Sequence, residues 1–181
     1  MEIDGVINAP KAPGIWGART FDSIDFERYV FVWSTAAVEA IVKLCERAGA
    51  EIVWVSGWNE QIDVLARLLG FGHTGADARV LESVVRGSTP YEKADALLLD
   101  LEENPLAPGE KWVWMDPSSD DVMQSEDYVY KMLTLNGYVP PLVTGLGVTP
   151  SLMQHLINVS GESKSGNGNG NKNKNKREGG K

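Results

Sequence analysis

Residues 1–7 read MEIDGVI, a short apolar run that carries two acids and leads into a turn near Gly5 and Asn8. Such a run predicts a buried strand with polar groups at its carboxyl end. The pattern returns at residues 51–57, EIVWVSG, and at residues 111–117, KWVWMDP. The chain therefore repeats one local arrangement, in which a buried strand stops at a polar loop.

Amphipathic stretches between these strands predict helices. In the first, Ser34 or Thr35 caps a helix whose apolar residues recur at helical spacing and which stops at Gly49. Apolar strands that alternate with amphipathic helices predict an α/β fold, with a doubly wound, mainly parallel sheet and helices on both faces. Further helices are predicted before Gly70, before Asn104, around residues 122–133 and over 149–159, and further strands at 29–33 and 141–143.

The composition fits one globular domain followed by a polar tail. Of the 181 residues, 43% are hydrophobic, and the single cysteine, Cys45, cannot form an internal disulfide. We expect residues 1–160 to form the domain and residues 161–181, which lack large apolar side chains, to form a disordered Gly/Asn/Lys-rich tail. No apolar run resembles a signal peptide or a membrane span, so the expected location is the cytoplasm.

Charge is distributed unevenly between these two parts. The whole chain carries −8, and the tail holds six basic and two acidic residues, so residues 1–160 carry −12. An acidic body repels a phosphate backbone, which argues against an extended nucleic-acid-binding surface. The basic tail is either a solubilising segment or a weak tether for anionic partners.

Chemically useful side chains follow the predicted strands. Asp4, Ser56 and Asp116 each come directly after a strand, and Lys93 opens the third helix. Because ligands of doubly wound sheets bind beyond the carboxyl ends of the strands, we expect these four side chains at one edge. Carboxylates can hold Mg²⁺, while a hydroxyl and an ammonium can bind phosphate oxygens. This set is typical of phosphoryl chemistry.

In order and spacing, these motifs resemble those of the haloacid dehalogenase-like (HAD) phosphohydrolase superfamily over about residues 1–160. The resemblance is strongest to small capless HAD domains of actinobacteria and their phages, some of which are linked to RNA-repair proteins. The four matching motifs are EIDGV at residues 2–6, IVWVSGWN at 52–59, TPYEK at 89–93 and WVWMD at 112–116, with Asp120 and Asp121 behind the last.

The resemblance implies a role for each residue. The first acid, Glu2, would be the nucleophile and a magnesium ligand, and Asp4 would be the general acid and base, with its carbonyl also on the metal. Ser56, Gly57 and Lys93 would hold the transferring phosphoryl group. The remaining magnesium ligands would be Asp116 and, through water, Asp120 or Asp121.

The sequence departs from the family at the nucleophile, where Glu2 replaces the usual aspartate. Glutamate can form an acyl phosphate, but its additional methylene moves the attacking oxygen by ~1 Å, which can reduce the rate by ~100-fold. Three hypotheses follow: a magnesium-dependent phosphomonoester hydrolase, a weak or inactive HAD-fold protein that binds a phosphorylated ligand or partner, and an unrelated doubly wound binding domain.

Structural alternatives exist for most of these residues. Asp4 can form a turn with Gly5, Ser56 can cap a helix, and Lys93 can be a solvated surface residue. A pair of acids, Asp120 and Asp121, can provide favourable charge at a helix N-terminus.

The segments that could cover the site are short. Residues 8–33 have room for a flap or hairpin and residues 70–90 only for a loop, so no separate cap domain is expected. An open site suits a phosphate on something large, such as a nucleic-acid end or a protein, or a substrate that another subunit covers, and the expected substrate is a phosphate end of a nucleotide or nucleic acid. There, Trp58 can either stack on a base or pack the following helix against the sheet, whereas Trp54, Trp112 and Trp114 are predicted core residues.

Overall fold

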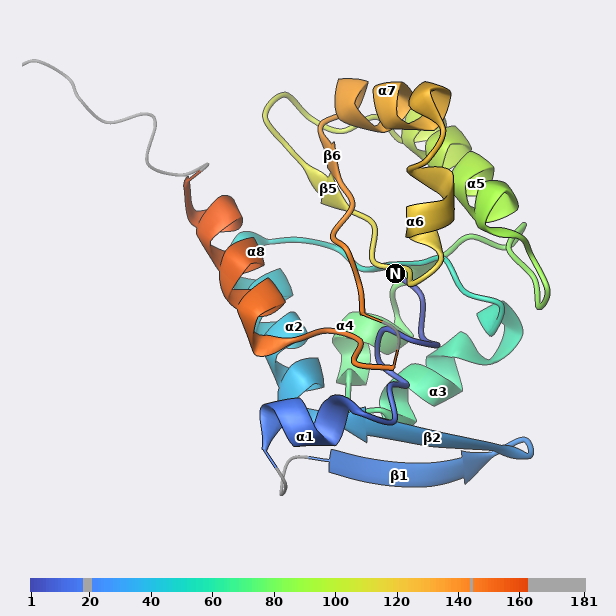
Figure 1. The fold of residues 1–181 in the computed structure, drawn as a ribbon, viewed down its shortest axis with the longest axis vertical. Helices are drawn as coiled ribbons and strands as arrows, with labels where there is room; N and C mark the ends of the chain where they lie inside the picture. Colours follow the sequence, from blue (N-terminus) through green and yellow to red (C-terminus); the bar gives the residue numbers. More distant parts are fainter. Residues whose placement is uncertain (18–20, 144, 163–181) are drawn as a thin grey trace, which may run out of the picture.

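A computed structural model describes residues 1–17, 21–143 and 145–162 of the chain (Figure 1). It contains helices and small parallel strand pairs, as expected of an α/β protein. Most of the predicted tail, from residue 163 on, lies outside the described residues, whereas residues 161 and 162 belong to the last helix. The helices are α1 (Ala12–Trp16), α2 (Thr35–Ala48), the 3-10 turn η1 (Asn59–Gln61), α3 (Ile62–Leu68), α4 (Gly72–Ala76), α5 (Pro90–Glu103), α6 (Ser119–Val122), α7 (Glu126–Thr134) and α8 (Pro150–Glu162).

An antiparallel hairpin occupies the segment where a flap or hairpin was predicted. Strand β1 (Phe21–Phe26) pairs with β2 (Tyr29–Ser34), so the predicted strand at 29–33 is confirmed. The two-residue turn consists of Glu27 and Arg28, with φ of 47° and 74°. Both values are positive, which matches the turns whose twist suits a hairpin.

The parallel pairs form from strands that are distant in sequence. Strand β3 (Val53–Trp54) pairs with β4 (Arg79–Val80), and β5 (Trp112–Val113) pairs with β6 (Gly137–Tyr138). The predicted strand at 141–143 is wrong, and β6 takes its place a few residues earlier. Pro140 and Pro141 lack backbone N–H groups, so this part of the chain cannot continue the pairing.

Residues 1–3 lie between the two parallel pairs. The Glu2 backbone N–H donates to the Met115 carbonyl (2.9 Å), and the Val55 N–H donates to the Met1 carbonyl (3.0 Å). Figure 1 accordingly shows the N-terminus in the middle of the molecule, between the β1–β2 hairpin and the helices α5 to α7. The first motif is thus hydrogen-bonded on both sides.

The chain turns sharply after residue 3. The Ile3 carbonyl accepts the N–H groups of Val6, Ile7 and Asn8 at 2.9–3.2 Å, and Gly5 has φ +76°. A Cβ at Gly5 would lie 2.6 Å from the Pro117 ring, so only glycine allows the first and fourth motifs to approach this closely.

Two apolar clusters hold these elements in place. Trp54 is fully buried in one and Trp114 is 1% exposed in the other, and Trp112 is also buried, so all three tryptophans are core residues as predicted. The apolar stripe of α5 and residue Cys45 are buried too. Among the described residues, no helix combines the length and apolar character needed to cross a bilayer.

Candidate functional site

Glu2 forms the centre of the site. Glu2 is only 5% exposed, because residues 1–3 lie between the two parallel strand pairs. One carboxylate oxygen, Oε1, accepts the Ile3 backbone N–H (2.8 Å) and the Ser56 hydroxyl (2.5 Å). Ser56 is fully buried and also accepts the Trp58 backbone N–H at 3.4 Å. The first two motifs therefore meet in direct contact.

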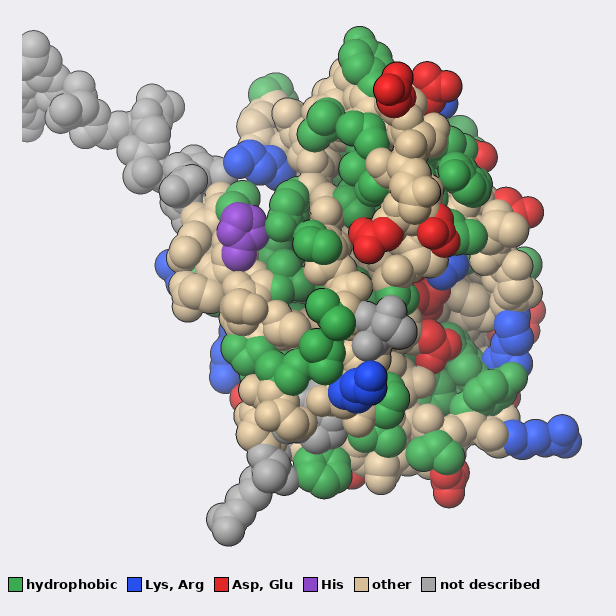
Figure 2. Space-filling view, in the orientation of Figure 1, with side chains coloured by type: hydrophobic (Ala, Val, Ile, Leu, Met, Phe, Trp, Pro, Cys, Tyr) green, Lys and Arg blue, Asp and Glu red, His purple; other side chains and the backbone are tan. Residues whose placement is uncertain are grey.

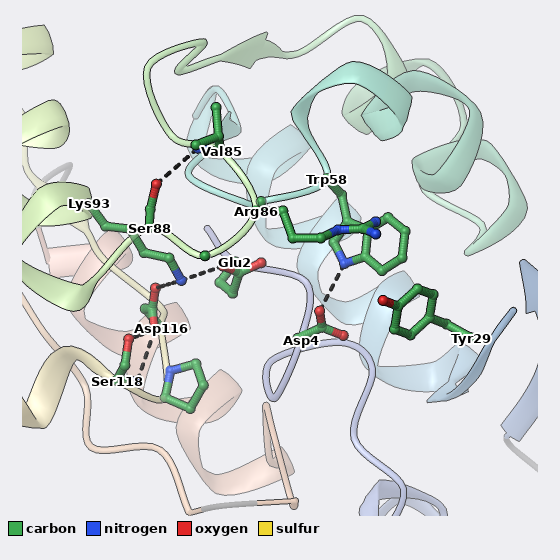
Figure 3. Close-up of a pocket in the computed structure, with 13 residues that line it drawn as sticks. Glu2, Asp4, Tyr29, Trp58, Val85, Arg86, Ser88, Lys93, Asp116 and Ser118 are labelled. Atoms are coloured by element: carbon green, nitrogen blue, oxygen red, sulfur yellow. Dashed lines mark hydrogen bonds and ion pairs between the residues drawn. The ribbon is translucent and has the colours of Figure 1, made fainter. Parts of the chain in front are cut away.

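Lys93 joins the third motif to the first and the fourth. Its ammonium donates to Glu2 Oε2 (2.5 Å) and to Asp116 Oδ2 (2.9 Å), and its side chain is only 13% exposed (Figure 3). Burial lowers the pKa of Lys93, but the negative charges of Glu2 and Asp116 outweigh burial and raise that pKa above its ordinary value. The lysine is therefore charged at neutral pH, and the solvated-surface alternative is wrong.

The start of α5 fixes the direction from which Lys93 approaches. The Thr89 hydroxyl accepts the Glu92 backbone N–H (3.2 Å), and the Glu92 carboxylate accepts the Thr89 backbone N–H (2.6 Å). These two hydrogen bonds form a capping box, with Pro90 in the first turn. Since Lys93 follows directly, the cap places the lysine in the first turn, facing the strand ends.

Asp116 is 1% exposed and is held from both sides. Its Oδ1 accepts the Ser118 backbone N–H (2.8 Å) and the Ser118 hydroxyl (2.5 Å), while Oδ2 accepts Lys93. Donors on both oxygens fix the orientation of the carboxylate and compensate for its burial. The role of Ser118 carries no distinctive sequence signal, because a serine after Asp-Pro is an ordinary turn residue.

Asp4 lies at the same cavity but points differently. It is exposed, and its carboxylate accepts the Asn8 amide (2.8 Å) and the Trp58 indole N–H (2.8 Å). In Figure 3 the Asp4 side chain faces Trp58, whereas the Glu2 side chain, which is buried, faces Lys93. The two acids of the first motif are thus oriented by different partners.

Trp58 packs in the protein and does not present a free stacking surface. It is 5% exposed and meets Phe31 and Tyr29 at centroid distances of 5.1 and 5.2 Å. The guanidinium of Arg86 lies over its ring. Trp58 therefore packs as a buried residue, but against aromatic rings of the β1–β2 hairpin, whereas the packing alternative placed it between the following helix and the sheet.

A cavity of about 350 Å³ connects these groups. The residues singled out from the sequence that line it are Glu2, Asp4, Gly57, Trp58, Lys93 and Asp116, whereas Ser56 is fully buried and does not line it. The cavity is also lined by residues that motif reasoning missed, namely Tyr29, Val85, Arg86, Gly87, Ser88, Pro117 and Ser118. No sequence signal marks Arg86, because it belongs to a loop that only folding brings to the site.

Asp120 and Asp121 are the two predicted site residues that lie outside both the cavity and the hydrogen-bonded network of Glu2, Ser56, Lys93 and Asp116. Both are exposed in the first turn of α6 and do not line the cavity. Figure 2 shows acidic side chains gathered around the position of α6 in Figure 1. Their placement matches the alternative in which they provide favourable charge at a helix N-terminus.

The carboxylate oxygens of the site are suitable ligands for a hard divalent cation. Glu2 and Asp116 direct one oxygen each toward the same ammonium, and one positive charge cannot neutralise both carboxylates. Within the described ranges, no group of three or more Asp, Glu, His or Cys residues has the spacing of a complete metal site. Mg²⁺ is commonly held by one or two carboxylates with water and substrate phosphate, so this pair of acids fits it.

Comparison with known proteins gave one family match. The model of a family described as "HAD domain in Swiss Army Knife RNA repair proteins" matches residues 1–135. The matched range includes Glu2, Ser56, Lys93 and Asp116. Neither the curated proteins nor the solved structures gave a significant match.

Proposed function

Because this chain belongs to the family of HAD domains found in Swiss Army Knife RNA repair proteins, we propose that it is a magnesium-dependent phosphomonoester hydrolase of the HAD type. The observation that carries the proposal is the contact of four motifs in one network. Ser56 and Lys93 donate to the two oxygens of Glu2, and Lys93 also donates to Asp116. Two anions and two donors in one network beside a cavity support a site for an incoming phosphoryl group.

The proposed fold behind this site is a single doubly wound sheet. The hydrogen bonds of residues 1–3 to Val55 and Met115 support the strand order β4, β3, residues 1–3, β5, β6. In this order residues 1–3 are central, and successive strands are added on one side of them as far as β4 and on the other side from β5 onward. Ligands bind at such a switch point in doubly wound sheets.

In the proposed reaction, a carboxylate oxygen of Glu2 attacks phosphorus while the bond to the leaving oxygen breaks. Asp4, which is exposed and lines the cavity, protonates the leaving oxygen and later takes a proton from the water that hydrolyses the acyl phosphate. Ser56 and Lys93 exchange their contacts with Glu2 for contacts with phosphoryl oxygens. The charge of Lys93 then offsets the negative charge of the transition state.

Glu2 and Asp116 are the proposed magnesium ligands. When bound, Mg²⁺ would neutralise charge on the phosphoryl oxygens and allow the carboxylate to approach them. The lysine leaves one of the two carboxylate charges uncompensated, which supports this assignment.

The proposed substrates are phosphate ends of nucleotides or nucleic acids. The family's description associates such domains with RNA repair, which favours a terminal phosphate as the target. The described part of residues 8–33 forms the short helix α1 and the β1–β2 hairpin, which supports a site open to a large substrate.

One observation favours a second function, in which the protein binds a phosphorylated ligand or partner without turnover. Both oxygens of Glu2 are engaged in short hydrogen bonds, and the residue is only 5% exposed. A nucleophile held in this way must exchange these partners before it can attack. The glutamate in place of the family's usual aspartate also favours binding without turnover, because its longer side chain displaces the attacking oxygen.

Hydrolysis of para-nitrophenyl phosphate, with and without Mg²⁺, tests the two functions. The proposed hydrolase predicts magnesium-dependent turnover by the native protein and a loss of at least ~100-fold in Glu2→Gln, which cannot form an acyl phosphate. The Glu2→Asp variant serves as the matched comparison. Turnover by Glu2→Asp alone would refute hydrolysis by the native chain and support the binding function.

A further inference from the structure

Arg86, on the loop between β4 and α5, is held beside two aromatic rings at the cavity. Its guanidinium carbon lies 4.4 Å from the centroid of the Trp58 ring and 5.2 Å from that of Tyr29. The two rings meet at 89°, so the guanidinium lies in the corner between them (Figure 3). Cation–π attraction to both rings orients this arginine although the residue is exposed.

The backbone of the same loop is also fixed. The Ser88 N–H donates to the Val85 carbonyl, and the Val85 N–H donates to the Ser88 hydroxyl, both at 3.0 Å. Gly87 completes the turn with φ +93°. A Cβ at Gly57 would lie 3.0 Å from the Arg86 Cα, so glycine in the second motif lets this loop approach the phosphate-binding end of the cavity.

Charge distinguishes Arg86 from the other cation at the cavity. Glu2 and Asp116 pair with Lys93, whereas no carboxylate among residues 1–17, 21–143 and 145–162 forms an ion pair with Arg86. Arginine presents its N–H donors in a planar fork that matches the oxygens of a phosphate. A guanidinium that is oriented by aromatic rings and lacks an acidic partner is suited to binding an anion from solution.

We propose that Arg86 binds a second phosphate of the substrate, so that the preferred substrate is a nucleic-acid end in which an internal phosphodiester follows the terminal phosphate. This inference rests on the proposed function. The cavity of about 350 Å³ runs between Lys93 and Arg86 and exceeds the needs of one phosphate group. Beside Arg86, Tyr29 is 47% exposed as a residue and offers a surface on which a base can stack, which favours a nucleic acid over a nucleoside diphosphate.

A specificity ratio tests the proposal. We define it as kcat/KM for a short oligonucleotide with a terminal phosphate divided by kcat/KM for para-nitrophenyl phosphate. In Arg86→Gln this ratio should fall by roughly 10- to 100-fold, the usual effect of losing a charged hydrogen bond. The control is Arg67→Gln, which removes an exposed arginine of α3 that pairs with Asp77 and should leave the ratio unchanged. Both 5′- and 3′-phosphorylated oligonucleotides are assayed.

Two outcomes overturn the proposal while leaving the hydrolase intact. The first is an unchanged ratio in Arg86→Gln when the native protein hydrolyses both substrates. The second is a dependence on Arg86 for a nucleoside diphosphate but not for the oligonucleotide, which would assign the second anion to a pyrophosphate. Failure of the native protein and of Glu2→Asp to hydrolyse either substrate would instead count against the proposed function.

In that case equilibrium binding of the phosphorylated oligonucleotide tests whether Arg86 contacts a second phosphate. Arg86→Gln should weaken binding by at least ~10-fold and make the negative slope of log K against log salt shallower by about 0.7, as expected for one lost phosphate contact on a single strand. Tyr29→Ala should weaken binding without changing this slope, because stacking releases no counterions and the Trp58 ring still holds Arg86. Equal affinity, or an equal salt slope, for Arg86→Gln and native protein would overturn the phosphate contact.

Discussion

At the scale of single residues, Lys93 determines the electrostatics of the site. Two buried carboxylates, Glu2 and Asp116, share its ammonium, and each would be costly to bury alone. The pKa of Lys93 is raised by these carboxylates against the opposing effect of burial. The two ion pairs of Lys93 therefore contribute fully to the free energy of unfolding below the unfolded pKa of about 10.4. This contribution is lost as pH rises through the higher pKa of Lys93 in the folded protein.

We expect Lys93→Met to destabilise the protein at pH 7 by about 3 kcal/mol, the lower end of the range for breaking a buried ion pair. The physical reason is that two carboxylates remain buried without a countercharge. Urea unfolding measures the change. Lys43→Met is the matched control, because Lys43 and Glu39 form an exposed pair, and we expect a change below about 1 kcal/mol. Equal effects of the two substitutions would contradict the assignment.

At the scale of elements, the N-terminus of α5 positions the lysine. Thr89 and Glu92 form reciprocal hydrogen bonds there, and the bond from the Thr89 backbone lowers the pKa of Glu92. The stabilisation from this charged carboxylate is present above its unfolded pKa of about 4.3 and is lost as pH falls through the lower folded pKa. The cap thus holds at neutral pH, where the site would act.

Replacing the capping side chain in Thr89→Ala should lower the free energy of unfolding by about 1 kcal/mol, since one backbone N–H of the first turn loses its acceptor. Thermal or urea unfolding at pH 7 checks this. In Thr89→Ser, which keeps the hydroxyl, most of the stability should return. A Thr89→Ala protein as stable as the native one would show that tertiary packing alone holds the start of α5.

At the scale of the whole molecule, the distribution of charge limits what the protein can bind. Residues 1–160 carry −12, yet the cavity is lined by two cations, Lys93 and Arg86, beside three acids. The acidic body repels long polyanions, whereas a single phosphate end needs only the few contacts inside the cavity. A divalent cation at Glu2 and Asp116 would make the site attractive to phosphate.

Magnesium should stabilise the folded protein in proportion to its occupancy. At a concentration 100-fold above the dissociation constant the gain is about 2.7 kcal/mol, or a rise in Tm of roughly 5–10 °C for a chain of this size. Thermal unfolding with MgCl₂, against NaCl at equal ionic strength, measures it. We expect Asp116→Asn to abolish the rise and the α6 double variant Asp120→Asn/Asp121→Asn to retain it. If only the double variant lost the rise in Tm, Asp120 and Asp121 would be the magnesium ligands and the assignment to Asp116 would be wrong.

Much of the architecture and part of the site follow from local sequence patterns. Apolar strands, capped helices and the order of the motifs predicted the α/β class, the core tryptophans and the stripe of α5. Such features depend on residues close in sequence, because hydrophobic periodicity and capping act over a few positions. The short strand β4 was missed, since a two-residue pairing at Arg79–Val80 leaves no periodic signal.

Only the tertiary structure decided which side chains share the cavity. The sequence by itself determined that Asp4, Ser56 and Asp116 follow strands and that Lys93 opens a helix, and therefore that they and the nearby Glu2 could meet. Folding turned the carboxylate of Asp4 toward Trp58, kept Asp120 and Asp121 on the surface of α6, and brought Arg86 against Trp58. These outcomes depend on contacts between distant segments, such as the close approach of the Arg86 loop to Gly57, which no local pattern encodes.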